Sequence, residues 1–241
     1  MRLVHAFLLL WFGLPASAAS EVLCENITYL GKSYTACTVD PARDNLRLFH
    51  KNSGQILGSF RAIENLPDVT ALPFAMNAGM YHADRTPVGL YIENGVEEMR
   101  VIPNAGPGNF GLLPNGVLCL NDDSAQVYET MDYIETAPAC RDATQSGPML
   151  VIDGDLHPRF LPDSTSRFLR NGVGTTAAGD SAVFVISNDV VSFHEFGSFF
   201  RDYLQLPNAL YFDGKVSRLH APALGRSDFG FQLGPMVGVV E

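Results

Sequence analysis

The stretch Asn208-Ala-Leu-Tyr-Phe-Asp213-Gly214-Lys-Val-Ser217 joins an apolar run to a polar end. The apolar run predicts a buried strand, and Asp213-Gly214 places a carboxylate and a flexible backbone where that strand ends. Functional sites in folds that combine helices and sheets often lie at such strand ends. The stretch therefore predicts a core strand and a candidate site together.

The residues before this stretch predict an amphipathic helix that starts at Ser192. Ser192 and Glu195 match a capping box, in which each side chain bonds a free amide at the helix start. Aromatic residues then recur at helical spacing, at Phe193, Phe196, Phe200 and Tyr203, and Pro207 ends the helix. Such a stripe is typical of core packing rather than of a ligand site.

The rest of the chain alternates apolar runs with turn signals such as Asn94-Gly95, Asp153-Gly154 and Asn171-Gly172, which favour hairpins. A short helix is predicted at Ala62–Leu66. Strands are predicted at Leu46–His50, Ile56–Phe60, Val88–Ile92, Val117–Leu120, Pro148–Ile152, Val173–Thr176, Ala182–Ser187, Ala209–Phe212 and Met236–Val240. This order predicts a single domain of the α+β or mixed α/β class, with a mixed sheet and a few helices.

The N-terminus has the pattern of a secretory signal peptide. Arg2 precedes a short apolar run, and Ala16-Ser-Ala18 matches a small-residue cleavage site. The run is shorter than the roughly 20 residues that span a bilayer. We therefore expect a signal peptide at 1–18, a mature domain at 19–241, a periplasmic or secreted location, and no stable membrane insertion after cleavage.

Composition narrows the classes of partner. The chain of 241 residues is 46% hydrophobic and 17% charged, which suits an ordered globular protein. Its formal net charge of −10 argues against nucleic acid and anionic membrane surfaces as partners. A small phosphorylated substrate is still compatible, because it needs only a local cation.

The chain has four cysteines, and an exported chain with an even number favours disulfides. Three pairings are conceivable. We favour Cys24–Cys37 and Cys119–Cys140, since both close short loops. No C-x-x-C spacing indicates a zinc site.

A first candidate segment is Met76-Asn77-Ala-Gly79-Met-Tyr81-His82. Asn77 and Tyr81 offer hydrogen bonds, although an Asx turn explains the pattern equally well. His82 and Asp84 are weak candidates for metal ligands, and a surface histidine is the simpler interpretation. A divalent metal therefore stays open as a cofactor.

Two further segments carry polar residues beside apolar runs. Gln145 and Ser146 fit substrate binding better than nucleophilic catalysis, because the chain has no G-x-S-x-G elbow. Arg170, followed by Asn171-Gly172-Val-Gly174, offers an arginine fork that matches phosphate or carboxylate. The alternative for the arginine is a solvated surface side chain, and for Asp213-Gly214 a simple hairpin turn.

Taken together, these segments resemble the phosphodiester glycosidase family, in its bacterial exported branch. The matching blocks occur in order and are MNAGMYHADRTPVGLYIENG from Met76, ATQSGPMLVIDG from Ala143, RNGVG from Arg170 and NALYFDGKVSRL from Asn208. Better-known members carry a run of glycines and then serines after the Asp-Gly. This chain has Lys215-Val-Ser217-Arg218 there, so Lys215 and Arg218 would narrow the pocket or make it more positively charged.

The resemblance implies hydrolysis of a sugar-1-phosphodiester, such as an N-acetylglucosamine-1-phosphodiester, between the sugar and the phosphate. We expect Asp213, Arg170 and Asn77 to be catalytic. Substrate binding is expected from Tyr81, Gln145, Ser146, Asn171, Gly172, Gly174, Gly214 and Ser217. Two alternatives remain: a non-catalytic binder of phosphorylated envelope glycans or exopolysaccharides, and a metal-dependent phosphodiesterase.

Overall fold

A computed structural model describes residues 22–241, so the predicted signal peptide lies outside the described residues. The described chain is mostly antiparallel β-sheet, with three short helices, α1 (Phe60–Glu64), α2 (Thr130–Thr136) and α3 (Phe193–Ser198). The predicted mixed sheet is wrong, because every strand pair in this range is antiparallel. No helix in residues 22–241 is long and apolar enough to cross a bilayer.

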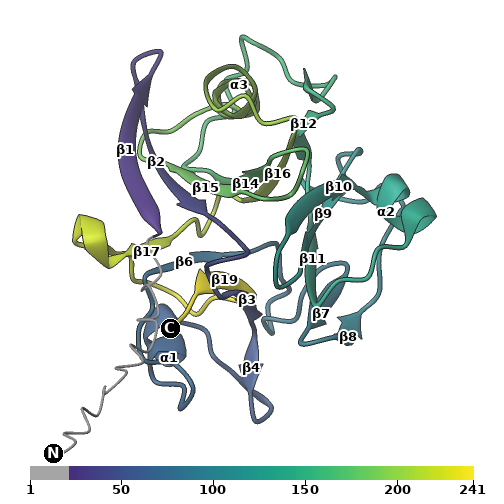
Figure 1. Cartoon of the computed structure of the whole chain (residues 1–241). Coiled ribbons are helices and arrows are strands. Elements are labelled where there is room, and N and C mark those ends of the chain that lie inside the picture. The colour runs from purple at the N-terminus through teal and green to yellow at the C-terminus, as the bar shows by residue number, and fades with distance from the viewer. Residues whose placement is uncertain (1–21) are drawn as a thin grey trace, which may run out of the picture.

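The largest sheet has seven strands and carries the stretch that opened the analysis. Its order is β1 (Leu23–Tyr29), β2 (Lys32–Val39), β15 (Ala182–Ser187), β14 (Asn171–Thr175), β16 (Asn208–Asp213), β12 (Met149–Ile152) and β13 (Asp155–Leu156). Helix α3 covers its outer face (Figure 1). Central strand β15 is therefore buried along its whole length, which explains its unbroken apolar sequence.

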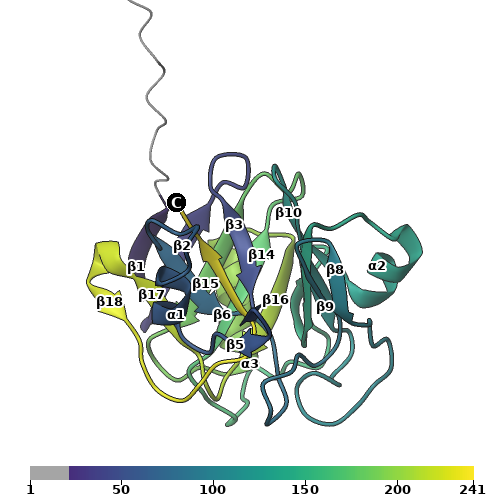
Figure 2. The same ribbon diagram turned by 90° about the horizontal axis from the view of Figure 1, so that it is seen from below.

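Two smaller sheets complete the fold. One has the order β10 (Ala125–Glu129), β9 (Gly116–Leu120), β11 (Asp142–Ser146), β7 (Tyr91–Glu93) and β8 (Val96–Met99). The other has the order β18 (Arg226–Ser227), β17 (Leu219–Ala221), β6 (Phe74–Asn77), β19 (Met236–Val239) and β3 (Leu46–Phe49), and β4 (Lys51–Asn52) pairs with β5 (Gln55–Ile56). Figure 2 shows the three sheets around a common interior.

Apolar side chains from all three sheets fill this interior. Phe74 of β6 packs against Phe184 of β15 with ring centroids 5.0 Å apart, and Leu118 of β9 and Phe212 of β16 belong to the same cluster. A second cluster lies between the seven-stranded sheet and α3. Strand β16 contributes to both clusters through alternating residues, Phe212 inward and Tyr211 toward α3.

Helix α3 confirms the predicted capping box. The Ser192 hydroxyl accepts from the Glu195 amide at 3.1 Å, and the Glu195 carboxylate accepts from the Ser192 amide at 2.7 Å. The helix continues as a wider π-helical turn at Phe199–Tyr203, which turns Phe199 inward together with Phe200. Phe199 stacks on Tyr34 at 4.1 Å, a contact that the regular helical spacing did not predict.

Several predicted boundaries are wrong for local reasons. The strand predicted at Ile56–Phe60 stops at Ile56, because Ser59 caps α1 by accepting from the Ala62 amide. Helix α1 thus starts before the predicted Ala62. The strand predicted at Val88–Ile92 begins only at Tyr91, since Gly89 has a φ of +81°. The N-terminal hairpin of β1 and β2 was not predicted.

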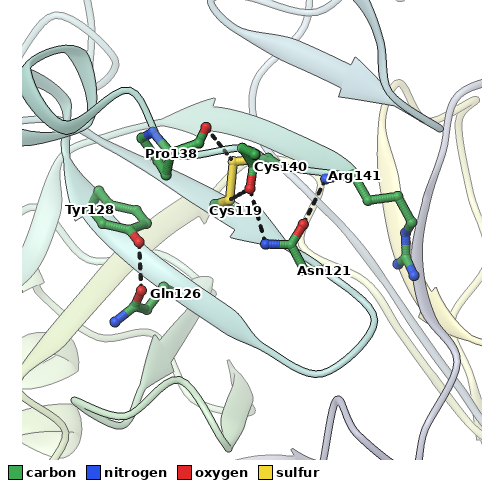
Figure 3. The surroundings of a disulfide bond; sticks show 8 residues. Cys119, Asn121, Gln126, Tyr128, Pro138, Cys140 and Arg141 are labelled. Atoms are coloured by element: carbon green, nitrogen blue, oxygen red, sulfur yellow. Dashed lines mark hydrogen bonds between the residues drawn. A yellow bond between two sulfur atoms is a disulfide. The ribbon is translucent and has the colours of Figure 1, made fainter.

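Both predicted disulfides, Cys24–Cys37 and Cys119–Cys140, are present. Cys24–Cys37 joins β1 to β2, and Cys119–Cys140 ties β9 to the segment after α2. Figure 3 shows that Asn121 supports the second disulfide, because its side chain donates to the Ala139 carbonyl and accepts from the Arg141 amide. Disulfides are typical of proteins that fold outside the cytoplasm.

A buried carboxyl lies between the two smaller sheets. Glu93, at the end of β7, accepts from the Tyr91 hydroxyl at 2.7 Å and from the His50 amide at 3.1 Å. Burial raises the pKa of Glu93 to about 7, with the charges of Glu98 and Asp142 acting in the same direction and the two hydrogen bonds opposing them. The folded protein therefore binds this proton more tightly than the unfolded chain does.

We expect replacement of both Cys119 and Cys140 by serine to lower the free energy of unfolding by about 3 kcal/mol, because the disulfide closes a loop with a sequence separation of 21 residues. Urea unfolding of the oxidised protein measures the change. A loss below about 1 kcal/mol would show that the disulfide adds little to the contacts around it.

We expect the contribution of Glu93 to the free energy of unfolding to decrease as pH rises. Its contribution is fully present below its unfolded pKa near 4.5 and is lost as pH rises through about 7, a change of at most about 3 kcal/mol. Glu93→Gln, which still accepts hydrogen bonds, should remove this part of the pH dependence. Urea unfolding between pH 4.5 and 8 tests this, with exposed Glu97→Gln as the control; identical pH profiles for both variants would contradict it.

Candidate active site

A cavity of about 660 Å³ lies at the end of β16. Its lining comes from five stretches of the chain: the loop after β6, the segment between β8 and β9, the segment before β14, the end of β16 with the residues that follow, and the loop before β19. The residues that matter for its chemistry are Tyr81, Arg85, Phe168, Tyr211, Asp213 and Lys215. The predicted candidates Tyr81, Asp213 and Gly214 thus meet at one cavity.

Asp213 is the acidic group in this lining. Its carboxylate accepts from the amides of Gly214 and, at 2.8 Å, Lys215. Burial raises the pKa of Asp213 above its ordinary value, and the backbone hydrogen bonds oppose that rise. The arrangement gives a carboxyl group of fixed orientation whose ionised form is poorly solvated, which is a common property of catalytic carboxylates.

Tyr211 reaches the same cavity because alternate residues of a strand point to the same side. Glycine is required at 214, since a Cβ there would lie 2.3 Å from the Tyr211 hydroxyl oxygen. Gly214 does not have a positive φ, so Asp213-Gly214 is not the type I′ turn that was the alternative. The glycine instead provides space beside the tyrosine.

Arg170 lies behind the cavity rather than in its lining. Its guanidinium is buried, donates to the carbonyls of Val191 at 2.9 Å and Ser166 at 3.1 Å, and lies 3.7 Å from the centroid of the Phe193 ring. Phe168 and Tyr211, which do line the cavity, both lie within 5.5 Å of it, measured from the guanidinium carbon to the ring centroids. Arg170 therefore positions aromatic walls, and the alternative of a solvated surface arginine is wrong.

Asn77 and Asn171 form a buried pair that joins β6 to β14. The Asn171 amide donates to the Asn77 backbone carbonyl at 2.9 Å and to its side-chain oxygen at 3.1 Å. The same side-chain oxygen accepts from the Arg218 amide at 2.8 Å. The pair thus fixes the segment after Asp213, and neither asparagine is in the cavity lining.

Gln145 and Ser146 are buried in β11, away from the cavity lining. Gln145 accepts from the amides of Leu90 and Ile102 and donates to the Ile102 carbonyl and the Thr130 hydroxyl. Ser146 donates to the Phe212 carbonyl at 3.2 Å. Their polar atoms hold neighbouring backbone in place, so the structure does not bring them to the candidate substrate.

Gly172 and Gly174 lie inside β14, which pairs with β15 on one side and β16 on the other. The predicted turn at Asn171-Gly172 is therefore wrong. A Cβ at 172 would lie 2.4 Å from the Leu210 carbonyl oxygen, and one at 174 would meet Leu206 and Phe200. Close packing accounts for both glycines, and their place within the sheet does not suit phosphate binding.

The remaining predicted residues lie near the cavity or on the surface. The Ser217 hydroxyl donates to the carbonyl oxygens of Asp213 at 2.9 Å and Leu169 at 3.1 Å. Asp84 accepts from the Thr86 amide and hydroxyl, which lower its pKa. Among residues 22–241 no group of three or more histidine, cysteine or acidic side chains is placed to hold a metal, so His82 and Asp84 belong to no such cluster.

Arg85 and Phe168 are cavity residues that sequence reasoning missed. The Arg85 guanidinium lies 5.3 Å from the centroid of the Tyr81 ring, and residue 85 has a φ of +73° in the turn after His82. Burial raises the pKa of Tyr81; the Asp213 charge adds to this and the Arg85 charge opposes it. The available signal for Arg85 was its position in the Met76 block, three residues after His82.

Comparison with known proteins shows the family to which the chain belongs. The family model described as phosphodiester glycosidase matches residues 70–220, which include the whole β6–β16 region around the cavity. The uncharacterized protein YigE of Escherichia coli (strain K12) is 32% identical over 209 residues, covering 85% of this chain and 80% of YigE.

Among solved structures, the chain is similar in fold to the catalytic domain of zebrafish N-acetylglucosamine-1-phosphodiester alpha-N-acetylglucosaminidase, auto-inhibited by its pro-peptide. The TM-score is 0.58 and the identity 14%, with 92% of this chain and 83% of the zebrafish chain covered. With the match of the family model and the identity to YigE, this protein belongs to the phosphodiester glycosidase family.

Proposed function

We propose that the protein is an exported hydrolase, periplasmic or secreted, that cleaves the glycosidic bond of a sugar-1-phosphodiester. The proposed domain is 19–241, after removal of a signal peptide at 1–18. The observation that carries the proposal is the half-buried carboxyl of Asp213 in a cavity that also holds the cations Arg85 and Lys215 and the aromatic rings of Tyr81 and Tyr211.

The two halves of such a substrate need different partners. Aromatic side chains suit the apolar faces of a sugar ring, whereas Arg85 and Lys215 suit the phosphate. Lys215 makes no ion pair within residues 22–241, so its charge is available to a ligand. In this proposal Arg85 and Lys215 bind the phosphate, the role that the sequence analysis expected of Arg170.

The chemistry follows from the leaving group. A phosphate monoester leaves more readily than a sugar alkoxide, so the need for a strong general acid is reduced. The oxygen of water bonds to the anomeric carbon, the proton that this water loses passes to the Asp213 carboxylate or to the phosphate, and the electron pair of the carbon–oxygen bond passes to the departing phosphate. Asp213 activates the water or stabilises the positive charge that develops on the sugar, and the cations stabilise the phosphate.

The remaining predicted residues have supporting roles in this proposal. Tyr81 and Gly214 contact substrate in the cavity lining. Arg170, Asn77 and Asn171 are positioning residues, because they hold Tyr211 and the segment after Asp213 in place. No step in this scheme requires a metal.

Cleavage in oxygen-18 water tests the reaction. Incubated with a panel of sugar-1-phosphodiesters, the protein is expected to place the label in the free sugar, because the carbon–oxygen bond breaks. Label in the phosphate would instead identify a phosphodiesterase. Saturable binding without turnover, in oxidised and folded protein, would identify a glycan-binding protein.

We expect Asp213→Asn to lower kcat/KM by about 10²- to 10⁴-fold, the usual contribution of a positioned acid or base. Because activity requires the ionised carboxylate and burial raises its pKa, activity should fall on acidification at a pH above the ordinary aspartate value of 3.8. A pH profile of kcat/KM measures this. The control is Asp163→Asn, on an exposed loop; equal activity of the two variants would remove Asp213 from the mechanism.

A further inference from the structure

A second cavity, of about 430 Å³, adjoins the candidate active site. The two share Lys215, Val216 and Phe231, so these residues form the boundary between them. The second cavity is further lined by Arg218, Arg226, Asp228 and Phe229. A molecule that extends past Lys215 from the first cavity would therefore enter the second.

The charge of this lining is opposite to that of the whole chain. The lining contains three basic side chains, Lys215, Arg218 and Arg226, and one acidic side chain, Asp228. Its formal charge is therefore +2. The formal net charge of the chain is −10. A local positive region on an acidic protein favours a bound anion over a neutral group.

The three cations differ in how far they are already paired. Arg226 forms an ion pair with Asp228 at 2.8 Å and donates to Thr35 and Asn188. Within residues 22–241 the Arg218 guanidinium donates only to a neutral carbonyl, that of Phe231, and Lys215 has no ion pair. Arg218 and Lys215 are thus the cations whose charge is available to a ligand.

The loop that follows Asp228 holds Arg218 in position. Gly230 has a φ of +153°, and a Cβ there would lie 2.4 Å from Arg218 Nη2, so glycine allows the backbone to pass close to the guanidinium. On either side, Phe229 is 95% exposed and Phe231 is 83% exposed. Apolar rings this exposed, beside unpaired cations, suit a ligand that is partly apolar and carries a negative charge.

We propose that the second cavity is a subsite for the leaving half of the phosphodiester, and that it selects a leaving half carrying its own carboxylate or second phosphate. This inference rests on the proposed function, since it places the bond to be cleaved in the first cavity. Arg218 bonds the additional anionic group, Lys215 lies between it and the bridging phosphate, and Phe229 covers the connecting carbons.

A matched pair of small phosphates tests the subsite without turnover. Glycerol 3-phosphate and 3-phosphoglycerate both carry a phosphate on three carbons, but only the second has a carboxylate. We expect wild-type protein to bind 3-phosphoglycerate about tenfold more tightly by calorimetry, equal to about 1.4 kcal/mol, and the preference to weaken as salt is raised.

Variants assign the preference to Arg218. Arg218→Gln should abolish it, Arg218→Lys should restore part of it, and the exposed control Arg159→Gln should leave it intact; thermal unfolding verifies that all three are folded. Equal affinity of the wild type for the two phosphates, binding of neither, or a preference that survives Arg218→Gln would overturn the proposal. If the protein prefers 3-phosphoglycerate but hydrolyses no phosphodiester, the anionic subsite is supported and the proposed hydrolase function is wrong.

Discussion

The hydrogen bonds between the buried amides of Asn77 and Asn171 hold together the parts of the molecule on which both cavities depend. They join β6 of one small sheet to β14 of the large sheet, and through the Arg218 amide they fix the segment that carries Asp213, Lys215 and Arg218. An unpaired buried amide is costly, so each partner requires the other. The asparagine pair thus holds the segment after Asp213, whose Gly214 and Lys215 amides in turn bond the candidate catalytic carboxyl.

The cations near the site also divide into one with a structural role and others that can contact a ligand. Arg170 is buried against aromatic rings and neutral carbonyls, which fix its position, and it does not line the cavity. Arg85 and Lys215 lie in the cavity lining instead. The chain therefore has one cation that orders the wall of the site and others that are free to contact a ligand.

Much of the large sheet was predictable because its inner strands β14 and β15 are fully buried and β16 is buried over most of its length. Ala182–Ser187 and the run before Asp213 are long apolar segments, and Ser192 with Glu195 marks a helix start that the structure confirms. The direction of pairing was not predictable, since a buried strand has the same apolar pattern in parallel and antiparallel sheets. The β1–β2 hairpin was missed because its outer face carries many exposed residues.

The site was predictable only in part. Asp213 and Gly214 were found through their place at a strand end, and Tyr81 was found as a hydrogen-bonding residue of the Met76 segment; the three do meet at the cavity. Gln145, Ser146 and Arg170 have the residue types of a binding site, but the partners that satisfy them come from distant segments, such as Ile102, Phe212 and Val191. A single sequence does not reveal whether a polar side chain is already bonded within the fold.

Gly230 narrows the routes by which such a protein can change its substrate during evolution. A side chain at this position would displace the Arg218 guanidinium and would be strained at a φ of +153°, so one substitution there would move a cation of the second cavity and change the path of its loop together. Phe229, which is almost fully exposed, can vary without disturbing either. Substitutions at position 229 can therefore adjust the second cavity to new ligands in small steps, whereas a substitution at position 230 changes the cation and the loop at once.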